Sequence, residues 1–525
     1  MAGIIPAMES AASNDTTLAE RCQALEAENE ALRNRVRWFE KQVFGQTSEK
    51  RPVDNPHQPG LDLGDTPVAC EPEGEKRTIT YQRGTAKKQR DEDCVNDAGL
   101  RFTEDVPVEV IETTPQELVG DDADAYEVIA THTTYRLAQR PPSYVVLQYQ
   151  RPVLRHKDRE QPEPCPAPAN VLDRSLADVS LLTGLLVDKF AYHLPLYRQH
   201  QRLQHAGITL SRATLTNLTK RTIELLRPIV EAQRDNVLRS RVLAMDETPI
   251  KAGKTGKGKM KQGWFWPLYG DHDELVFTYA ASRARRHVEQ TLSGHFQGTL
   301  ISDGYAAYAR YAEQCDDVTH AQCWAHTRRQ FIDAEASEPD AAGQALAWIR
   351  ALYQHESEAN EQGLEGEKKR AHRLAHSKPV VDELYQWCEA QLQRKDLTPK
   401  SPFTRALNYL LGRERALRVF LEDPDVPLDT NHLERALRPI PMGRKNWLFC
   451  WTEIGAEHVG LIQSLISTCK LHNINAYTYL TDVLLRINEH PASRVAELTP
   501  RLWKEHFADN PLRSDLYTAG NHVGE

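Results

Sequence analysis

The chain has 525 residues, of which 40% are hydrophobic and 26% are charged. This length exceeds what one hydrophobic core usually supports, so several domains are expected, and no run reaches the roughly 18 apolar residues of a membrane span. The net charge of −9 argues at first against a nucleic-acid partner. However, residues 91–127 hold thirteen acidic side chains against Arg101 alone, which places −12 in one segment and leaves +3 on the remainder. This acidic segment is interpreted as a solvated linker or sheet edge.

The cysteines and the first residues indicate the cellular setting. The nine cysteines lie far apart and never form a CxxC pair, which favours reduced thiols over a disulfide framework or a zinc knuckle. The opening MAGIIPAMES has neither a basic segment nor a long apolar stretch, so secretion is not indicated. We therefore expect a cytoplasmic protein without a membrane anchor.

Residues 1–45 carry a heptad repeat that begins at Leu18. Asn29 occupies a core position, where asparagine pairs best with its counterpart in a two-stranded coil, so the repeat favours a homodimer or a higher oligomer. A single amphipathic helix that packs on its own chain is the alternative. The turn-forming residues after Gly45 end the helix. The two core positions are held by Leu18, Leu25, Leu32 and Phe39 and by Cys22, Asn29, Val36 and Val43.

Residues 46–102 and 103–165 differ in composition. The first segment is polar and rich in Pro, Gly and Lys, and it predicts a linker that becomes acidic. In the second, VPVEVIE, TTYRLAQ and YVVLQYQRPVLRH are β-branched and aromatic runs that predict a small sheet. The sheet ends in a basic cluster that faces either DNA or water. Its members are Arg151, Arg155, His156, Lys157 and Arg159.

Residues 166–240 are predicted to be helical and to contact DNA. One helix covers 194–205, Gly207 interrupts the pattern, and Ser211 is placed to cap a second helix that runs through Leu226. This is helix-turn-helix spacing, and a helical hairpin without DNA contact is the alternative. The second helix is expected to place Leu215, Leu218 and Leu225 inward and to leave Arg212, Asn217, Lys220 and Arg221 for a DNA groove or phosphates.

Two aspartates stand at the ends of apolar, strand-like runs. RVLAMDETPI delivers Asp246, and GTLISDGYAAY delivers Asp303. Between them the sequence predicts a hairpin into a second strand, a third strand at ELVFTYAASR and a short helix over 286–292. A carboxylate in an apolar strand usually faces a charge or a metal ion, because burying it alone is costly. Taken singly, either aspartate is better explained as the cap of a turn or the partner of an arginine.

A third candidate carboxylate, Glu434, lies on a later helix in LDTNHLERALRPI. Asp429 or Thr430 is placed to cap this helix, and Pro439 ends it. Arg438 follows four residues later, so a surface Glu–Arg pair is the alternative. Two aspartates from strands and one glutamate from a helix suit Mg²⁺, with Mn²⁺ as a substitute, because hard cations prefer oxygen ligands. In phosphoryl transfer, two such ions clamp the attacking and leaving oxygens.

The order and wording of these motifs resemble the insertion-sequence-66 family of bacterial DDE transposases, from the coil through nearly the whole chain. The matching segments are VFGQTSEK, KFAYHLPLYRQ, MDETPI, SDGYAAY, CWAHTRRQF, NHLERALRPI and GRKNWLF. The resemblance implies an α/β catalytic core, a ribonuclease H-like mixed sheet, with Asp246, Asp303 and Glu434 as its catalytic and metal-binding triad. It also implies a nucleoid-associated protein that recognises terminal inverted repeats and target DNA and works with two small accessory proteins of the same element.

The spacing of this triad predicts an interrupted core. Residues 241–335 would form its first part, and 421–452 would carry the helix of the glutamate. The long interval from Asp303 to Glu434 leaves excess length, and helical periodicity over 336–420 predicts a helical insertion there. Residues 453–525 are expected to form packed helices without chemistry of their own.

The chain departs from the family at one point. Family members commonly carry a cysteine- and histidine-containing zinc-binding segment between the coil and the core, and this sequence lacks that spacing. Cys94 and Cys165 stand alone. The sheet at 103–165 is therefore expected to fold without structural zinc.

Basic residues near the predicted chemistry are further candidates for DNA contact. The lysines of the 251–261 hairpin, followed by Trp264 and Trp266, fit binding by charge and stacking, or else form a solvated hairpin. His326 is placed to assist near the site, or to act as a hydrogen-bonded helix histidine. The remaining candidates are Lys254, Lys257, Lys259, Arg328, Arg329, Arg435, Arg438, Arg444 and Lys445.

Three functions compete at this stage. The leading hypothesis is metal-dependent cleavage at transposon ends, followed by attack of the freed 3′-hydroxyl on target DNA. A transposase-derived DNA-binding regulator would use the coil and the helix-turn-helix region without catalysis, but the intact carboxylates argue against it. A nuclease that acts on RNA hybrids would leave the coil and the long flanking domains without an evident purpose.

Overall fold

The computed structural model describes residues 100–519 apart from short gaps. The gaps are 105, 116–117, 120–122, 141–142, 157–162, 165–167, 257–258, 293–295, 448–449 and 451. The predicted coil, nearly all of the predicted linker, Cys94, Cys165 and Lys257 lie outside the described residues. Residues 93–335 and 340–525 form one compact unit. Within the described ranges, no helix is long and apolar enough to cross a membrane.

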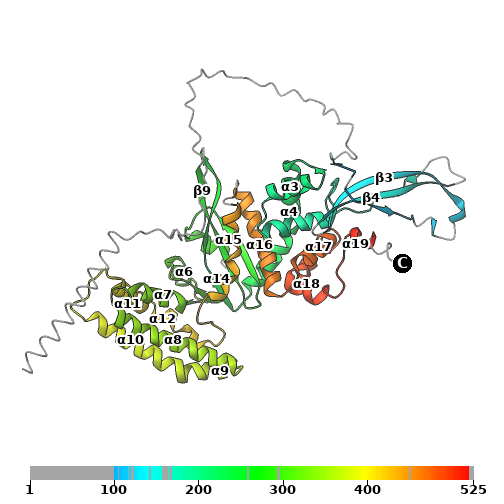
Figure 1. Ribbon diagram of the computed structural model, residues 1–525. Coiled ribbons are helices and arrows are strands. Elements are labelled where there is room, and N and C mark those ends of the chain that lie inside the picture. The colour runs from blue at the N-terminus through cyan, green and yellow to red at the C-terminus, as the bar shows by residue number, and fades with distance from the viewer. Residues whose placement is uncertain are drawn as a thin grey trace, which may run out of the picture. The chain divides into compact units, whose positions relative to one another are not determined.

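A six-stranded mixed sheet forms the centre of this unit (Figure 1). Its order is β10-β9-β7-β11-β12, with β8 also paired to β9; β7, β11 and β12 run parallel, and β9 is antiparallel to β7, β8 and β10. The predicted hairpin and three further strands are confirmed. The strands are β7 (Val242–Met245), β8 (Thr248–Gly256), β9 (Lys259–Tyr269), β10 (Leu275–Ala280), β11 (Gly298–Ser302) and β12 (Val318–Gln322).

Strand β10 lies at the edge of the sheet, and helix α16 (Glu453–Leu471) covers it. The backbone N–H of Phe277 donates to Ser464 Oγ at 2.9 Å, and that of Leu275 donates to Thr468 Oγ1 at 3.1 Å. Backbone N–H groups at this sheet edge, which could otherwise pair with another strand, therefore donate to side chains of the helix. Helix α16 is followed by α17 (Ala476–Arg486), η4 (Ala492–Leu498), α18 (Pro500–His506) and α19 (Asp515–Ala519), which confirms the predicted C-terminal helices.

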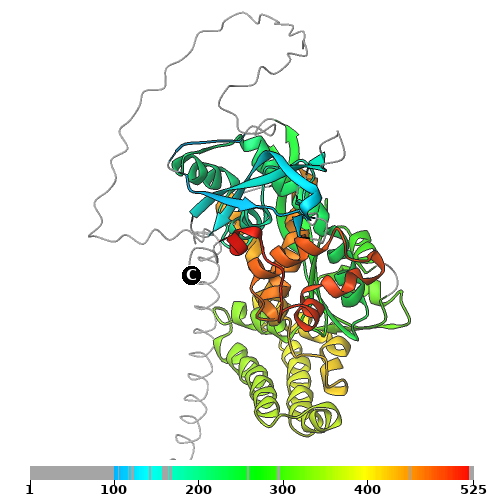
Figure 2. The same ribbon diagram turned by 90° about the vertical axis from the view of Figure 1, so that its right-hand side faces the viewer.

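The segment between β12 and the helix of Glu434 is helical, as predicted. Apolar residues recur every three or four positions in α8, where Ala342, Ala345, Ile349 and Leu352 are buried. In Figure 2 these helices gather in one group, drawn in light green and yellow. They are α7 (Trp324–Ala334), α8 (Pro339–Glu361), α9 (Gly366–His372), a π-helical turn η3 (Arg373–Ser377), α10 (Lys378–Leu392), α11 (Pro402–Leu411), α12 (Glu414–Leu417) and α13 (Val419–Glu422).

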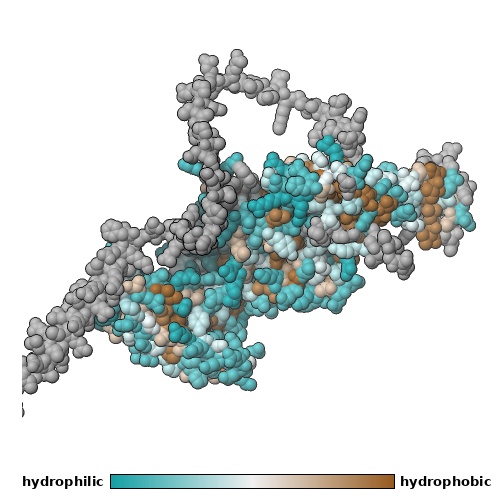
Figure 3. Space-filling view, viewed as in Figure 1, coloured by the Kyte–Doolittle hydropathy of each residue, from teal (hydrophilic) through white to brown (hydrophobic). Residues whose placement is uncertain are grey.

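The small sheet predicted within residues 103–165 is also confirmed. Two long antiparallel strands dominate it, and the exposed apolar side chains of Val128 and Ile129 lie on one of them. Figure 3 shows brown apolar surface along this pair of strands. The sheet consists of β2 (Val108–Glu112), β3 (Tyr126–Arg140), β4 (Ser143–His156) and β5 (Glu163–Pro164), in the order β2-β4-β3, with β5 on β4. A turn η2 (Ala123–Ala125) precedes β3, and β1 (Arg101–Phe102) pairs with β6 (Ile208–Thr209).

The helix-turn-helix region contains α2 (Val179–Phe190), α3 (Leu196–His205) and α4 (Arg212–Leu238). Gly207 adopts φ of +78° in the turn, and Ser211 Oγ accepts a hydrogen bond from Thr214 N at 3.0 Å, so the predicted break and cap are confirmed. The predicted end of the second helix at Leu226 is wrong. The helix continues through Pro228 to Leu238, because its apolar face stays buried over those turns.

The inward face predicted for α4 is largely confirmed. Leu215 and Leu218 are buried, whereas Leu225 is partly buried and packs against the core. Because these leucines face the core, the polar side chains on the other face of α4 point away from it.

Candidate active site

Asp246 and Glu247 occupy a break in the sheet between β7 and β8. The pairing with β9 stops at Met245, which faces Leu268, and resumes at Thr248, which faces Phe265. The same register across the break sets Pro267 opposite Asp246, and proline has no N–H to donate to the ladder. The chain therefore leaves the sheet for two residues, and both are acidic.

Asp303 directly follows β11, the parallel neighbour of β7. In that pairing Thr299 faces Val242 and Ile301 faces Ala244. Continuing this register by two residues sets Asp303 beside Asp246. Because side chains alternate between the two faces of a sheet, residues in register share a face. The parallel sheet thus explains why two aspartates that are distant in sequence lie together.

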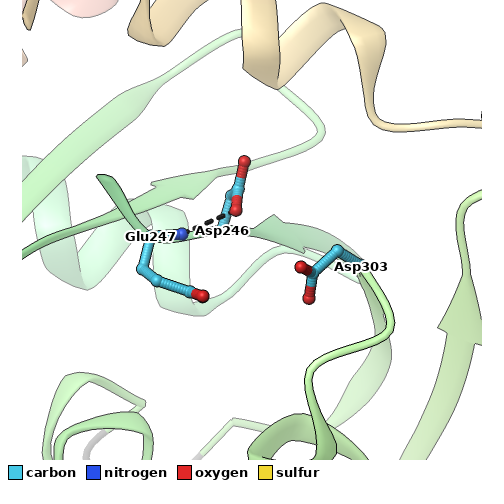
Figure 4. Close-up of side chains that lie close together, drawn as sticks. All are labelled: Asp246, Glu247 and Asp303. Atoms are coloured by element: carbon cyan, nitrogen blue, oxygen red, sulfur yellow. Dashed lines mark hydrogen bonds between the residues drawn. The ribbon is translucent and has the colours of Figure 1, made fainter. Parts of the chain in front are cut away.

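Asp246, Glu247 and Asp303 form a carboxylate cluster (Figure 4). One carboxylate oxygen from each residue lies within 4.8 Å of the other two. In the described part of the chain, no other three His, Cys, Asp or Glu side chains bring their ligand atoms this close together. Sequence reasoning missed Glu247. The signal was present, since a second acid directly beside Asp246 at the end of a buried strand is as costly to bury as the first.

Burial and neighbouring charges hold a proton on Asp246. Burial, together with the charges of Glu247, Asp303 and Glu434, raises the pKa of Asp246 to about 7, although the backbone N–H of Glu247, which donates to Asp246 Oδ1 at 2.7 Å, opposes the shift. A bound cation would favour the ionised form and reverse this shift.

Both carboxylate oxygens of Glu247 accept hydrogen bonds from neighbouring side chains. Arg283 Nε donates to Glu247 Oε1 at 2.7 Å, and the hydroxyl of Tyr308 donates to Oε2. The side chain of Glu247 is 2% exposed, and burial raises its pKa although both partners oppose the shift. The guanidinium of Arg283 lies over the ring of Tyr305, 4.2 Å from its centroid. These contacts fix the carboxylate and the backbone N–H that contacts Asp246.

Close contacts around Asp303 position its backbone. Asp303 Oδ1 accepts a hydrogen bond from Tyr305 N at 2.8 Å, which begins the turn into α6 (Ala306–Ala312). A Cβ on Gly304 would lie 2.4 Å from the hydroxyl oxygen of Tyr409, so only glycine fits there without a shift. Arg413 Nη2 donates to the Gly304 carbonyl at 3.1 Å. Helix α11 and the residues after it therefore support this turn.

Glu434 lies on α14 (Asn431–Leu437), outside the group that meets the 4.8 Å distance. Its charge nevertheless raises the pKa of Asp246, so the two carboxyl groups are electrostatic neighbours. Glu434 Oε1 lies 3.6 Å from His326 Nε2 on α7. His326 Nδ1 is buried and has no hydrogen-bond partner within the described ranges.

Helix α14 begins against the end of β12. Thr430 is the N-cap residue, but its side chain makes no capping bond; the side chain of Asp429, one residue earlier, accepts a hydrogen bond from Asn431 N at 2.9 Å instead. Thr430 N donates to Cys323 Sγ at 3.3 Å, and Trp324 N donates to the Leu428 carbonyl at 3.1 Å. The helix ends before Pro439, as predicted, and α15 (Pro439–Trp447) begins there.

The chemistry of these donors fits a divalent cation. The cluster offers carboxylate oxygens, which are the ligands that Mg²⁺ and Mn²⁺ prefer. Arg283 contacts Glu247, and no cationic side chain of the described residues is recorded against the half-buried Asp246, which is consistent with the raised pKa of Asp246. Asp246 and Asp303 would hold the ion, and Glu434 and Glu247 stand next to them.

The residues predicted to bind DNA lie in different surroundings. Most are exposed: Arg212, Asn217, Lys220, Lys254, Lys259, Arg328, Arg329, Arg435, Arg438 and Lys445. Arg221 is half-buried and donates to the Asp173 carbonyl at 3.1 Å. Arg444 is also half-buried and donates to the Pro249 carbonyl of β8, so its guanidinium already braces the hairpin.

Comparison with known families decides the relationship. Residues 174–458 match the model of the Transposase IS66 family, and residues 464–501 match the IS66 C-terminal element. The chain belongs to the IS66 transposase family. The order of its central sheet is consistent with the ribonuclease H-like core of a DDE enzyme. The family implies polynucleotidyl transferase activity, DNA as a binding partner and, for DDE transposases generally, a divalent metal ion.

Several relatives of this IS66-family transposase occur in Sinorhizobium fredii, and each is described as an uncharacterized protein. The protein y4hP is 31% identical over 71% of this chain and 71% of its own length. The protein y4jD is 28% identical over 90% of this chain and 94% of its own length. The protein y4qI is 30% identical over 75% and 74%.

Proposed function

We propose that this IS66-family transposase cleaves the ends of its insertion sequence and joins them to target DNA, with Asp246, Asp303 and Glu434 as the catalytic triad and Mg²⁺ as cofactor. The observation that carries the proposal is the pairing of Asp246 with Asp303 at the ends of β7 and β11, where their oxygens approach within 4.8 Å. Mn²⁺ is expected to substitute, because it accepts the same oxygen ligands.

The proposed reaction has two transfers at the same residues. Water attacks the phosphodiester at the transposon end, the bond from phosphorus to the 3′ oxygen breaks, and a 3′-hydroxyl is left on the element. That hydroxyl then attacks a target phosphodiester, forms a new phosphorus–oxygen bond and releases a target 3′-hydroxyl. When bound, the metal ions would activate the attacking oxygen and neutralise charge on the leaving oxygen.

The residues of the chain have separable roles in this scheme. Asp246 and Asp303 bind the ions, and Asp246 must first lose the proton that burial holds on it. Glu434 completes the site from α14, and His326 orients it at 3.6 Å. Glu247 is a positioning residue, because Arg283 and Tyr308 occupy both of its oxygens.

DNA is proposed to reach this site along exposed basic side chains. Arg328 and Arg329 share helix α7 with His326, and Arg435 and Arg438 follow Glu434 within the next four residues, so phosphates held there would lie near the triad. Arg444 is proposed to act mainly through the hairpin that it braces. Helices α3 and α4, with Arg212, Asn217, Lys220 and Arg221, are proposed to contact the terminal inverted repeats. Oligomerisation through the N-terminal coil is proposed from the heptad repeat. Cooperation with two small accessory proteins is proposed from the family resemblance.

A cleavage assay on the element's own end DNA with Mg²⁺ tests the assignment. Asp303→Asn is expected to abolish cleavage and to leave DNA binding intact, because the amide keeps the shape of the side chain and removes its charge. Asp333→Asn, an exposed aspartate on α7, is the matched control and should cleave like the wild type. Cleavage by Asp303→Asn at the wild-type rate would refute the triad. Binding without any Mg²⁺- or Mn²⁺-dependent cleavage by the wild type would favour the DNA-binding regulator.

A further inference from the structure

Three histidines meet in the helical segment between β12 and α14, away from the carboxylate cluster in the chain. His355 lies on α8, His372 is the last residue of α9, and His376 lies in the π-helical turn η3. The ring centroids of His372 and His376 are 4.5 Å apart, those of His355 and His376 are 5.8 Å apart, and those of His355 and His372 are 6.5 Å apart. No step of the proposed transposition reaction uses these side chains.

The ring separations lie near those of imidazoles that share a metal ion. A tetrahedral Zn²⁺ with Zn–N bonds of about 2.0–2.1 Å holds the centroids of two bound imidazoles roughly 5 Å apart. The three observed separations fall on both sides of that value. The nitrogen atoms of the three rings do not all lie within 4.8 Å of one another, so binding of an ion requires the rings to rotate toward it.

A buried ion pair holds the two histidine-bearing segments in register. Arg373, between His372 and His376, is 0% exposed, and its Nε and Nη2 donate to the two oxygens of Glu356 on α8 at 2.6 and 2.8 Å. Its Nη1 donates to the carbonyls of Phe420 and Asp423 at 2.6 and 2.9 Å. A bidentate, fully satisfied arginine is expensive to move, so the backbones that carry the histidines are fixed. Single π-helical turns of this kind occur frequently at functional sites.

The polar atoms of the cluster are left available for a ligand. His372 is 10% exposed, and its Nδ1 is buried with no hydrogen-bond partner among the described residues. Its other nitrogen, Nε2, lies 4.0 Å from Glu358 Oε2, so the carboxylate of Glu358 is close enough to serve as a fourth ligand. Ser377 Oγ lies 3.3 Å from His355 Nδ1 and leaves the other nitrogen of that ring for a ligand.

We propose that His355, His372 and His376 bind a transition-metal ion of the Zn²⁺ class, with Glu358 as the fourth ligand. The ion would join α8 to the α9–η3 turn and stabilise this segment against unfolding. Imidazole-rich sites select Zn²⁺, Co²⁺ or Ni²⁺, whereas a site of carboxylates alone suits Mg²⁺ or Mn²⁺. The two sites therefore differ in the metal they take, and the histidine site stands even if the catalytic assignment fails.

Zinc binding to the full chain in excess Mg²⁺ tests the proposal, because Mg²⁺ occupies oxygen sites and competes poorly for imidazole. One equivalent of Zn²⁺ is expected to bind the wild type. His372→Gln and His376→Gln are each expected to lose at least about tenfold in affinity. His205→Gln, at an exposed histidine on α3, is the matched control and should bind like the wild type. His376 is exposed, so its replacement leaves the core intact.

A second readout separates a ligand from a merely structural residue. Zn²⁺ is expected to raise the melting temperature of the wild type and of His205→Gln, and to raise that of His376→Gln less, because the stabilisation falls as the affinity for the ligand falls. Unchanged Zn²⁺ affinity in both His372→Gln and His376→Gln would overturn the proposal, as would a wild type that binds no Zn²⁺.

Discussion

The two aspartates and Glu434 reach the same region of the IS66-family transposase by different means. Asp246 and Asp303 end the neighbouring strands β7 and β11, whose parallel register holds both backbones. Glu434 stands on the seven-residue helix α14, which pairs with no strand and is held by side-chain contacts, among them those of Tyr353 with Asp429 and of Tyr269 with His432. A continuous sheet resists displacement more than a short helix does. The strand ends are therefore expected to be the more rigid half of this comparison.

The largest expected effect tests the rigid half of this comparison. Asp246→Asn and Asp303→Asn should each lower single-turnover cleavage by roughly a thousandfold or more, because removal of one catalytic group disables the whole site. Asp246→Asn should also leave the melting temperature unchanged or higher without metal, since it removes a buried carboxyl that is crowded by three others. Calorimetry of the metal-free protein checks this. A large fall in melting temperature would mean that Asp246 has a structural role.

Changes of side-chain length test whether α14 is more adjustable than the strand ends. Displacing a catalytic group by about 1 Å can cost about a hundredfold in rate. Glu434→Asp should therefore retain about one hundredth of the wild-type rate, because α14 can shift to compensate, whereas Asp303→Glu should show no cleavage above that of Asp303→Asn. Equal losses in both variants would contradict the difference in rigidity.

Glu247 tests whether a positioning residue at the sheet edge acts through stability. Glu247→Gln should lower the free energy of unfolding by roughly 1–3 kcal/mol, because one of the two acceptor oxygens becomes an NH2 group and leaves Arg283 or Tyr308 facing a donor. Urea unfolding measures this loss. Tyr308→Phe, which removes only the hydroxyl donor, should cost less. A Glu247→Gln variant that is stable and yet inactive would show instead that Glu247 itself binds the cation.

The raised pKa of Asp246 gives the strand-end site a pH dependence. Below about pH 7 this carboxyl is protonated, and a cation must displace the proton before it binds. Mg²⁺ affinity should thus fall by about tenfold per pH unit below 7 and level off above it. The stability of the metal-free protein follows the opposite trend. Because the pKa of Asp246 is higher in the folded state than in the unfolded state, the free energy of unfolding decreases as pH rises toward 7. Mg²⁺ titrations followed by melting temperature test both statements, and Asp246→Asn should flatten both profiles.

The smallest expected effect concerns the exposed basic residues. Lys254→Ala and Lys259→Ala, on the β8–β9 hairpin, should each weaken DNA binding a few-fold for every sequence tested and lower the salt slope by about 1. Fluorescence anisotropy at several salt concentrations measures both. An unchanged slope would assign these lysines to the solvated surface. Arg444→Lys should leave the salt slope unchanged, because Arg444 already donates to the Pro249 carbonyl and is proposed to act through the hairpin.

The outcome of the sequence predictions follows from the range of the interactions involved. Hairpin β8–β9, strand β11 and the Ser211 cap were predicted because periodicity and capping act over a few neighbouring residues. Strand β12 was not predicted, because VTHAQ is polar in composition although the structure places it beside β11. Helix α4 passes its predicted end for a similar reason, since burial against the core outweighs the local signal of Pro228.

The sequence by itself determined the family, the three candidate acids and the helical character of the segment between Asp303 and Glu434, because motif wording and periodicity are local properties of the chain. Only the tertiary structure decided that Asp246 and Asp303 stand in register, that Glu247 joins them, and that three histidines on different turns come together. Each of these depends on which segments become neighbours. That choice is made by the burial of apolar surface and by strand pairing across the whole unit, which no short stretch of residues contains.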